Sequence, residues 1–546
     1  MARIRQAAHY TESLTPMLFQ LVIFLSGAAI LALELLASRV MTPYFGVSLY
    51  IWTGILSITL VALALGYWLG GRMTRGVDPR RLARWYTLIP AAAALAIVVA
   101  CLVYPRAFAP LANWDLMLGA FAACLLLLFV PLVLTSAMNP LLVALNRNTA
   151  GSEGDAGSGR VFFVSTVGSV AGVLLTAFGL IPHFTNYVAV LLVAATLALL
   201  SLLLAAWPPA PVSGRTSAIV LALVAAGAAV LLMVKADAYT GRNGPLAYAG
   251  EQWQVEATLG SLFGTVKILR SAPDPASGRF QRIYFHDSIT QNTVDSSGAS
   301  QSFYTYALEA LTRAYRPDLR HALMLGMGAG IVTMRLADRG VITDVVEINP
   351  VALEVAQRYF GYDARRARTH ITDARTFVRA CPQPYDVVLI DLFQGDGTPE
   401  YLVTREFFAD VARCLAPEGI VVFNTFADLE HPTSYAHFLV TLKSELPHLA
   451  LFRPDWHGAV HVNSFVVASA RPLPARQPVM IDGVPERHRA TLFDMLARPT
   501  PLTPALYAGG QLVSDAHNAA AHELAMTEVI YRRSVVENLP AALLLN

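Results

Sequence analysis

The stretch "LMLGMGAG", residues 323–330, decides the fold of the C-terminal half of this chain. An apolar run leads directly into Gly326, Gly328 and Gly330. Glycines at such a turn allow backbone N–H groups and the N-terminus of the next helix to approach a ligand closely. A single residue separates the last two glycines, where a dinucleotide-binding fingerprint has two. The turn therefore favours an adenosyl ligand over NAD.

Strands and helices alternate along the chain from this turn onward. Apolar, β-rich segments predict five strands, at 322–326, 342–347, 368–372, 386–391 and 419–424. The segments between them predict helices, and this alternation is typical of a doubly wound α/β sheet. We therefore predict a Rossmann-like (class I methyltransferase-like) domain over residues 321–474. Alternating β-rich segments before it predict a small β-rich subdomain, with a helix, at 253–320.

Carboxylates follow three of the predicted strands, and ligands of doubly wound sheets bind at the carboxyl ends of the strands. Glu347 ends the second strand, 21 residues after Gly326, where a carboxylate can accept both hydroxyls of a ribose. Asp373 follows the third strand and can accept a hydrogen bond from an adenine amino group. Asp391 ends the fourth strand. Together they predict a nucleoside site, although a purely structural role for Asp391 stays open.

The first 235 residues differ in composition from the remainder. The chain is 55% hydrophobic and 14% charged, whereas about a quarter of the residues of a soluble domain are charged. Residues 1–235 hold 13 Lys and Arg against 6 Asp and Glu, and residues 236–546 hold 27 against 32. We predict a transmembrane helical domain at 1–235, a linker at 236–252 and a C-terminal extension at 475–546.

A membrane span needs about 20 apolar residues. Seven segments qualify, at roughly 17–37, 49–70, 86–104, 115–137, 161–181, 187–207 and 216–235. The fourth stays apolar past Pro131 to Leu145, so it is either one long kinked helix or a span with a re-entrant piece. The total of seven or eight decides on which side of the membrane the globular domain lies.

The loop at 71–85 carries five arginines and is cytoplasmic by the positive-inside rule. Seven spans would then place the globular domain outside and eight would place it inside, so its side stays open. Glu34 lies within the first span, where a carboxylate is costly unless it is paired or faces a polar cavity. A structural ion pair with Arg39 and a transport role both remain open. Small residues in "STVGSVAG", 165–172, favour close helix packing.

Other classes of site have little support in the sequence. The formal net charge of +2, without a basic stripe and interleaved aromatics, gives no indication of nucleic-acid binding. Cys101 and Cys124 lie in apolar stretches, and Cys381 and Cys414 have no CxxC or metal-like spacing. We therefore predict neither a disulfide nor a metal site.

Over about 255–470 the chain resembles the polyamine aminopropyltransferases, the spermidine synthase family. "LMLGMGAG" resembles its glycine motif, "VVEINP" its ribose motif, "TDARTF" its adenine motif and "LIDLFQGDGTPEYL" its catalytic loop. "IYFHDSITQNTVD" resembles the stretch that closes over the thioether end, with Asp287 and Gln291 in matching places. Tyr304 matches a tyrosine near the acceptor amine. The fusion to a multi-span domain is similar to a bacterial spermidine synthase-like subgroup, which implies a multi-pass protein of the bacterial inner (cytoplasmic) membrane.

The resemblance implies an aminopropyl transfer from decarboxylated S-adenosylmethionine to a small-molecule amine, which releases methylthioadenosine. Glu347 would hold the ribose, Asp373 the adenine, and Asp391 would act as catalytic acid or base, with Tyr304 beside the amine. The chemistry is reasonable because an amine with a pKa of about 10 is protonated in water. It must lose a proton before it attacks the carbon next to a sulfonium, and a positioned carboxylate can take that proton.

Three positions depart from the family pattern. The acidic residue of the glycine turn is Ala329, the second acid of the catalytic loop is Gln394, and the glutamate after the Tyr-His pair is Tyr306. A diamine carries two positive charges, so these changes leave a less anionic acceptor pocket, for which Asp396 is a possible substitute acid. The donor site is kept, whereas acceptor recognition is changed.

Two other functions stay open beside aminopropyl transfer. One is an S-adenosylmethionine-dependent methyltransferase, because the altered glycine turn leaves the choice of donor uncertain. The other is a transporter or sensor that binds a nucleoside or polyamine without turnover, which Glu34 and the altered pocket motivate. The expected partners are the amine and the lipid bilayer, and the sequence leaves open both the acceptor and a homo-oligomeric state.

Overall fold

The computed structural model describes residues 2–46, 49–114, 116–150, 155–206, 215–239, 242, 244–393, 397–430, 432–456, 461–518, 531–533 and 535–545. The chain divides into two compact units. The first contains Met1–Leu246 together with Val536–Asn546, and the second contains Ala247–Val535. The first unit is called the membrane unit below and the second the globular unit. The finer domain boundaries stay predictions.

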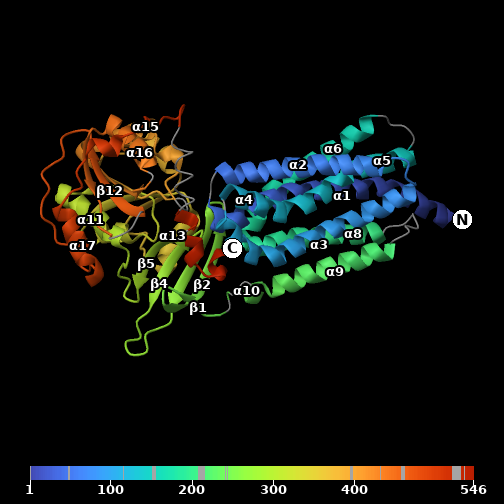
Figure 1. Ribbon diagram of the computed structural model, residues 1–546, viewed down its shortest axis with the longest axis horizontal. Helices are drawn as coiled ribbons and strands as arrows, with labels where there is room; N and C mark the ends of the chain where they lie inside the picture. Colours follow the sequence, from blue (N-terminus) through green and yellow to red (C-terminus); the bar gives the residue numbers. More distant parts are fainter. Residues whose placement is uncertain are drawn as a thin grey trace. The chain divides into compact units, whose positions relative to one another are not determined.

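The membrane unit is a bundle of long apolar helices (Figure 1). Within the described residues, seven helices are long and apolar enough to cross a membrane. This confirms the seven predicted spans as helices. Their elements are α1 (Ala2–Phe45), α2 (Leu49–Met73), α3 (Pro79–Ala112), α4 (Leu116–Cys124) with α5 (Val130–Ala150), α6 (Asp155–Leu175) with α7 (Ile181–His183), α8 (Asn186–Ala206) and α9 (Arg215–Val234).

The fourth span is one continuous helix and not a span with a re-entrant piece. A π-helical turn at Leu125–Phe129 joins α4 to α5, just ahead of Pro131. Proline has no N–H to continue the i to i−4 pattern, and a wider turn lets the helix pass it without ending. A second π-helical turn, Thr176–Leu180, joins α6 to α7 in the fifth span. Both interruptions bend a helix without adding a crossing.

Small residues hold α1 and α6 together, as the "STVGSVAG" pattern predicts. A Cβ atom at Gly168 would lie 2.0 Å from the carbonyl oxygen of Phe24, and one at Gly172 would lie 2.3 Å from that of Ala28. The hydroxyl of Ser169 donates to the carbonyl of Gly27 over 3.0 Å. Backbone contact this close requires the missing side chains. The stretch therefore packs helices. Glu34 is partly buried on α1.

The end of the chain belongs to the membrane unit. After α9, the short helix α10 (Ala236–Tyr239) leads toward the globular unit, and the chain returns with α19 (Ala541–Leu544). Val536, Leu544 and Leu545 are buried in the same core as the spans. The guanidinium of Arg242 donates to the carbonyl of Leu545 over 2.9 Å. The globular unit is thus inserted between two segments of the membrane unit.

The globular unit begins with an antiparallel sheet, which is the small β-rich region expected before residue 321. Its strand order follows the sequence from β1 to β5. The hairpin between the last two strands turns at Asp287 and Ser288, which both have positive φ. The helix α11 (Phe303–Tyr315) follows. The strands are β1 (Leu246–Tyr248), β2 (Glu251–Ser261), β3 (Gly264–Ser271), β4 (Gln281–His286) and β5 (Ile289–Asp295).

The main sheet has seven strands in the order β11-β12-β10-β9-β6-β7-β8. Its five parallel strands match the five predicted ones: β6 (His321–Leu325), β7 (Ile342–Glu347), β8 (Arg368–Ile371), β9 (Tyr385–Ile390) and β10 (Leu415–Asp428). Two strands that the sequence patterns did not predict extend the sheet beyond β10. β12 (His461–Ser469) pairs antiparallel with β10, and β11 (His448–Phe452) pairs antiparallel with β12. The Rossmann-like fold is confirmed.

The strand order changes direction at β6. From β6 the chain moves outward to β7 and β8, and then returns to place β9 on the other side of β6. Doubly wound sheets bind ligands at this switch point, because the loops after the two central strands diverge there. The glycine turn after β6 and Asp391 after β9 therefore lie next to each other, and the amide of Asp391 donates to the carbonyl of Leu325 over 2.9 Å.

Helices cover both faces of the sheet. On one face the core packs against α11, and on the other it packs against α15 and α16. The remaining helices of the unit are α12 (Ile331–Ala337), α13 (Pro350–Tyr359), α14 (Ala374–Ala380), α15 (Arg405–Arg413), α16 (Thr433–Glu445) and α17 (Glu486–Ala497).

One expectation about the cysteines is wrong. Cys381 and Cys414 form a disulfide, at a sequence separation of 33. Cys381 follows α14 and Cys414 follows α15, and the two helix ends meet on one face of the sheet, where the Cα atoms are 5.7 Å apart. Sequence spacing gave no indication of the pair because the fold, and not a short motif, brings the helix ends together.

Candidate active site

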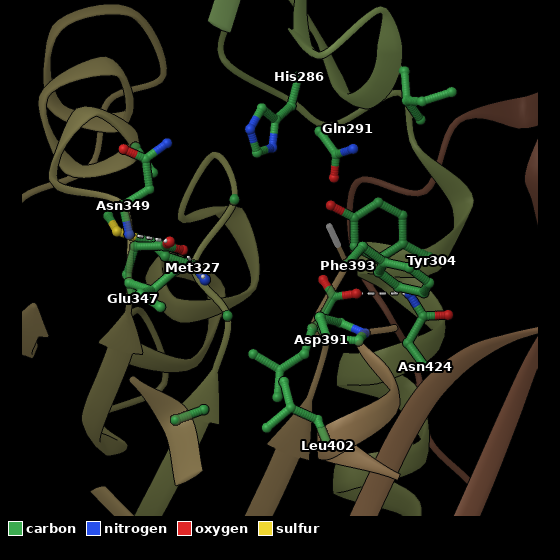
Figure 2. Close-up of a pocket in the computed structure, with 18 of the residues that line it drawn as sticks. His286, Gln291, Tyr304, Met327, Glu347, Asn349, Asp391, Phe393, Leu402 and Asn424 are labelled. Carbon is green, nitrogen blue, oxygen red and sulfur yellow. Dashed lines mark hydrogen bonds between the residues drawn. The ribbon is translucent and has the colours of Figure 1, made fainter. Parts of the chain in front are cut away.

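A cavity of about 370 Å³ lies over the carboxyl ends of the central strands of the main sheet. Residues of the small sheet and of α11 complete its walls. Figure 2 shows Glu347 and Met327 on one wall, with Asp391, Asn424 and Tyr304 on the other. The lining contains seven of the nine residues predicted for the site: Gln291, Tyr304, Gly326, Gly328, Glu347, Asp373 and Asp391.

The three glycines of the turn have different tasks. Gly326 has a φ of +89°, and a Cβ atom there would lie 2.1 Å from the carbonyl oxygen of Asp391. Gly328 has a φ of +51° and no atom within 4 Å of its Cβ direction, so it leaves the floor of the cavity open. Gly330 begins α12 and contacts the ring of Tyr362 instead of the cavity. The first and third glycines permit the fold, and the second makes space for a ligand.

Glu347 is held in place by backbone donors from two turns. Its Oε2 accepts from the N–H of Met327 over 3.0 Å, and its Oε1 accepts from the N–H of Asn349 over 2.8 Å. Enclosure by the cavity raises the pKa of Glu347, and these hydrogen bonds oppose that change. A carboxylate oxygen can accept more than one hydrogen bond. Both oxygens thus remain available for a diol such as the two hydroxyls of a ribose.

Asp373 has a structural task beside its place in the cavity wall. It caps α14, and its Oδ1 accepts from the N–H of Thr376 over 2.8 Å and from the Thr376 hydroxyl over 3.0 Å. Its Oδ2 accepts from the hydroxyl of Tyr401 over 3.4 Å. Burial raises the pKa of Tyr401 to about 12, and the charge of Asp373 adds to this effect, so the phenol stays a donor at neutral pH.

Asp391 is the carboxylate with the clearest chemical signature. Burial raises its pKa to about 6, the charge of Glu347 adds to the increase, and a hydrogen bond from Asn424 opposes it. That bond runs from Nδ2 of Asn424 to Oδ1 of Asp391 over 2.8 Å. A carboxylate with this pKa is a stronger base than an exposed aspartate and is still mostly ionised at pH 7.

Tyr304 lies on α11 beside Asp391. Its hydroxyl oxygen accepts from Nδ2 of Asn292 over 3.0 Å. Burial raises the pKa of Tyr304, and the charge of Asp391 adds to the increase. The phenol therefore stays protonated, with a remaining lone pair and its own proton directed at neighbours in the cavity. Gln291 lies above it on the same wall (Figure 2).

Two predicted site residues are not part of the cavity lining. Gly330 is one, as described above. Asp287 is the other: its Oδ1 accepts from the N–H of Thr265 over 2.8 Å, and its backbone carbonyl accepts from Arg532 over 2.6 Å. Its position in the family motif reflects the tight β4–β5 turn, where it has a φ of +45°. Gln394 and Asp396 lie outside the described residues.

Several lining residues escaped the sequence patterns. Asn424 ends the fifth predicted strand, so the strand-end rule that found Asp391 could have found it. His286 stands beside Asp287 in the quoted motif, and its Nε2 lies 2.8 Å from the carbonyl of Phe263. Phe393 stands two residues after Asp391 in the quoted catalytic loop. No pattern marked Phe426, Asn463 and Tyr531, which also line the cavity. Among the described residues, no group of His, Cys, Asp and Glu is arranged to hold a metal ion.

Comparison with known proteins supports this picture of the globular unit. Residues 301–451 match the model of the spermine/spermidine synthase domain family. A polyamine aminopropyltransferase of Vibrio vulnificus is 36% identical over 119 residues, which are 21% of this chain and 40% of the relative. An N-terminal histidine N-methyltransferase of Emericella nidulans is 33% identical over 184 residues, which are 31% of this chain and 32% of the relative.

The chain thus spans less than half the length of either relative. The crystal structure of spermidine synthase from Thermotoga maritima aligns at 18% identity and a TM-score of 0.33, over 50% of this chain and 88% of that one. The matched family region contains the glycine turn and all three carboxylates of the cavity. Residues 301–451 of the globular unit thus match the spermine/spermidine synthase domain family, as the sequence motifs indicate.

Proposed function

We propose that this protein is a membrane-anchored aminopropyltransferase, which moves an aminopropyl group from decarboxylated S-adenosylmethionine to an amine. One observation carries the proposal. Glu347, Asp373 and Asp391 line a single cavity, and none of its described lining residues is a lysine or arginine. Such a cavity attracts a cation, and a sulfonium nucleoside is a cation with an adenosine attached.

The charge of the cavity also favours one donor over another. The decarboxylated donor carries a sulfonium and an ammonium, whereas intact S-adenosylmethionine carries a carboxylate as well. A buried charge without an opposite partner is strongly disfavoured. Among the described lining residues the additional carboxylate would meet three acids and no guanidinium or ammonium group. We therefore propose the decarboxylated form as the donor.

The proposed reaction gives each residue a separate task. Glu347 binds the ribose, and Asp373 lies on the adenine side. The acceptor nitrogen attacks the carbon next to the sulfonium, a C–N bond forms, and the C–S bond breaks with its electrons moving to sulfur. Asp391 takes the proton that the amine loses. Tyr304 accepts an N–H of the same amine and orients its lone pair. Methylthioadenosine and the aminopropylated amine leave.

The proposal is tested with the detergent-purified full-length chain, each of the two sulfonium donors and a panel of amines, with products read by mass spectrometry. We expect methylthioadenosine and an amine heavier by one aminopropyl group, from the decarboxylated donor only. Release of S-adenosylhomocysteine from the intact donor would instead establish a methyltransferase. That second candidate is favoured by the similarity to a histidine N-methyltransferase. Tight donor binding without any product would contradict both enzymes and support the sensor reading.

The pKa of Asp391 predicts a specific pH dependence. Its pKa of about 6 means that the free enzyme loses its base as the pH falls through 6, and not near 4 as an exposed aspartate would. We expect kcat/KM for the donor to be level above about pH 7 and to fall about tenfold for each pH unit below about 6. A profile measured from pH 4.5 to 8 checks this. A midpoint near 4 would contradict the burial of Asp391.

The membrane unit supports a location for this activity. We propose that its seven apolar helices cross the inner (cytoplasmic) membrane of a bacterium, so that the bilayer anchors the enzyme. Anchoring brings the cavity close to acceptors that a membrane holds or delivers. Full activity of residues 236–546 alone on soluble amines would argue against a contribution of the membrane unit to catalysis.

A further inference from the structure

The wall of the cavity beyond Asp391 is built from amides. Nδ2 of Asn424 donates to Asp391 over 2.8 Å, and Oδ1 of Asn424 accepts from Nδ2 of Asn463 over 3.2 Å. The two asparagines lie on the antiparallel strands β10 and β12, both of which reach the cavity. The Asn463 amide thus donates to Asn424, and the Asn424 amide donates to Asp391. This row of neutral groups ends at the ionised carboxylate and carries no charge of its own.

Three aromatic rings continue the same wall. The rings of Phe393 and Phe426 meet edge to face with centroids 5.2 Å apart, and those of Phe426 and Tyr531 lie 5.8 Å apart at 32°. All three side chains line the cavity. We call Phe393, Phe426 and Tyr531 the aromatic wall. Rings in this arrangement offer a large apolar surface with little conformational freedom to lose on binding.

The three carboxylates are not spread evenly around the cavity. Glu347 accepts a hydrogen bond from the backbone of the glycine turn. Asp373 is the N-cap residue of α14, and its carboxylate accepts from the N–H of Thr376. Of these three, Asp391 is the one that accepts a hydrogen bond from the amides, through Asn424. Figure 2 shows it on the same side of the cavity as Phe393, with Glu347 on the opposite side. In the proposed reaction Asp391 receives the proton of the attacking nitrogen. Among the described lining residues, a second ammonium on the acceptor would therefore meet amides and rings and no further carboxylate.

We infer that the acceptor is a singly charged amine with an apolar or aromatic body, and not a diamine. The inference rests on the proposed aminopropyl transfer. The inference follows because the charge of the acceptor has to match the charge of the cavity wall that it contacts. Asp391 neutralises one ammonium, and the apolar body displaces water from the aromatic wall, which is favourable. Against the described residues of this wall, the extra charge of a diamine would lose its hydration without gaining a carboxylate, which is unfavourable.

The test compares amines that differ in one end group. The full-length protein is given the decarboxylated donor with butylamine, 1,4-diaminobutane or 2-phenylethylamine, and kcat/KM is measured from the rate of methylthioadenosine release. We expect both monoamines to exceed the diamine at least about tenfold, with 2-phenylethylamine the best of the three. An equal or better diamine would overturn the inference and leave the transferase intact. No methylthioadenosine with any amine would instead reject the proposed function.

A matched pair of variants at Phe426 checks that the wall sets this preference. Phe426→Gln and Phe426→Glu have the same shape and differ by one charge. Relative to the glutamine variant, we expect the glutamate variant to raise the ratio of diamine to butylamine kcat/KM at least about tenfold, because it supplies the missing carboxylate. An unchanged ratio in two folded variants would show that the distal end of the acceptor does not meet this wall, and would overturn the assignment.

Discussion

Asp391→Asn is expected to lower kcat by a factor of about 10² to 10⁴, the range typical of losing a positioned general base. Asparagine has nearly the same shape as aspartate, and its Oδ1 can still accept the hydrogen bond that Asn424 donates over 2.8 Å. It cannot take the proton of an attacking amine. Burst and steady-state rates of methylthioadenosine release, measured with saturating donor, report the loss.

The control for this variant is Asp373→Asn, which alters a carboxylate placed at the cap of α14. We expect it to weaken donor binding while it leaves kcat within about tenfold of the original, because Asp373 is not near the transferred proton. Equal kcat for the Asp391→Asn variant and the unmodified protein would remove Asp391 from the chemistry. If the protein is instead a sensor that binds the donor without turnover, the Asp391→Asn variant would keep donor binding and every measurable function.

Gly326→Ala is expected to have the largest effect on stability. A methyl group at this position would lie 2.1 Å from the carbonyl oxygen of Asp391, and the φ of +89° is unfavourable for any residue with a Cβ atom. The ends of β6 and β9 would have to separate. We expect a loss of about 2–4 kcal/mol in unfolding free energy, together with nearly complete loss of turnover. Thermal unfolding in detergent and product formation measure the two effects.

Gly328→Ala is the matched control for that variant. Its φ is also positive, at +51°, yet no atom lies within 4 Å of the added methyl group. We expect a smaller loss of stability, of about 1 kcal/mol, and weaker donor binding because the methyl group enters the cavity. If the two variants unfolded at the same temperature, this would contradict the view that Gly326 is needed for the close contact between the ends of β6 and β9.

The parts of the site that sequence patterns predicted are those that secondary structure places. The carboxyl ends of parallel strands share one edge of a sheet, so Glu347, Asp373 and Asp391 could be grouped as soon as the strands were found. Asp287 shows the limit of motif matching. Its place in the motif was clear, but the motif does not say whether its side chain faces the ligand or the backbone. In the structure its carboxylate accepts from the N–H of Thr265 on the neighbouring strand β3.

The aromatic wall and Asn463 could not be predicted in the same way. Asn463 and Tyr531 come from β12 and from the segment beyond α17, which approach the cavity only after the sheet has been extended by antiparallel strands. Their sequence surroundings are ordinary. The disulfide between Cys381 and Cys414 was missed for a related reason, because two helix ends meet on one face of the sheet without a local sequence pattern.

The odd number of apolar helices bears on the supply of the donor. Seven crossings bring the chain out at residue 236 on the face opposite to its N-terminus and to the arginine-rich loop at 71–85. The returning tail packs against the same bundle and adds no crossing. If all seven helices cross the bilayer and that loop obeys the positive-inside rule, the proposed reaction would release its methylthioadenosine on the extracytoplasmic side. A sulfonium donor synthesised in the cytosol must then be exported before it can be consumed.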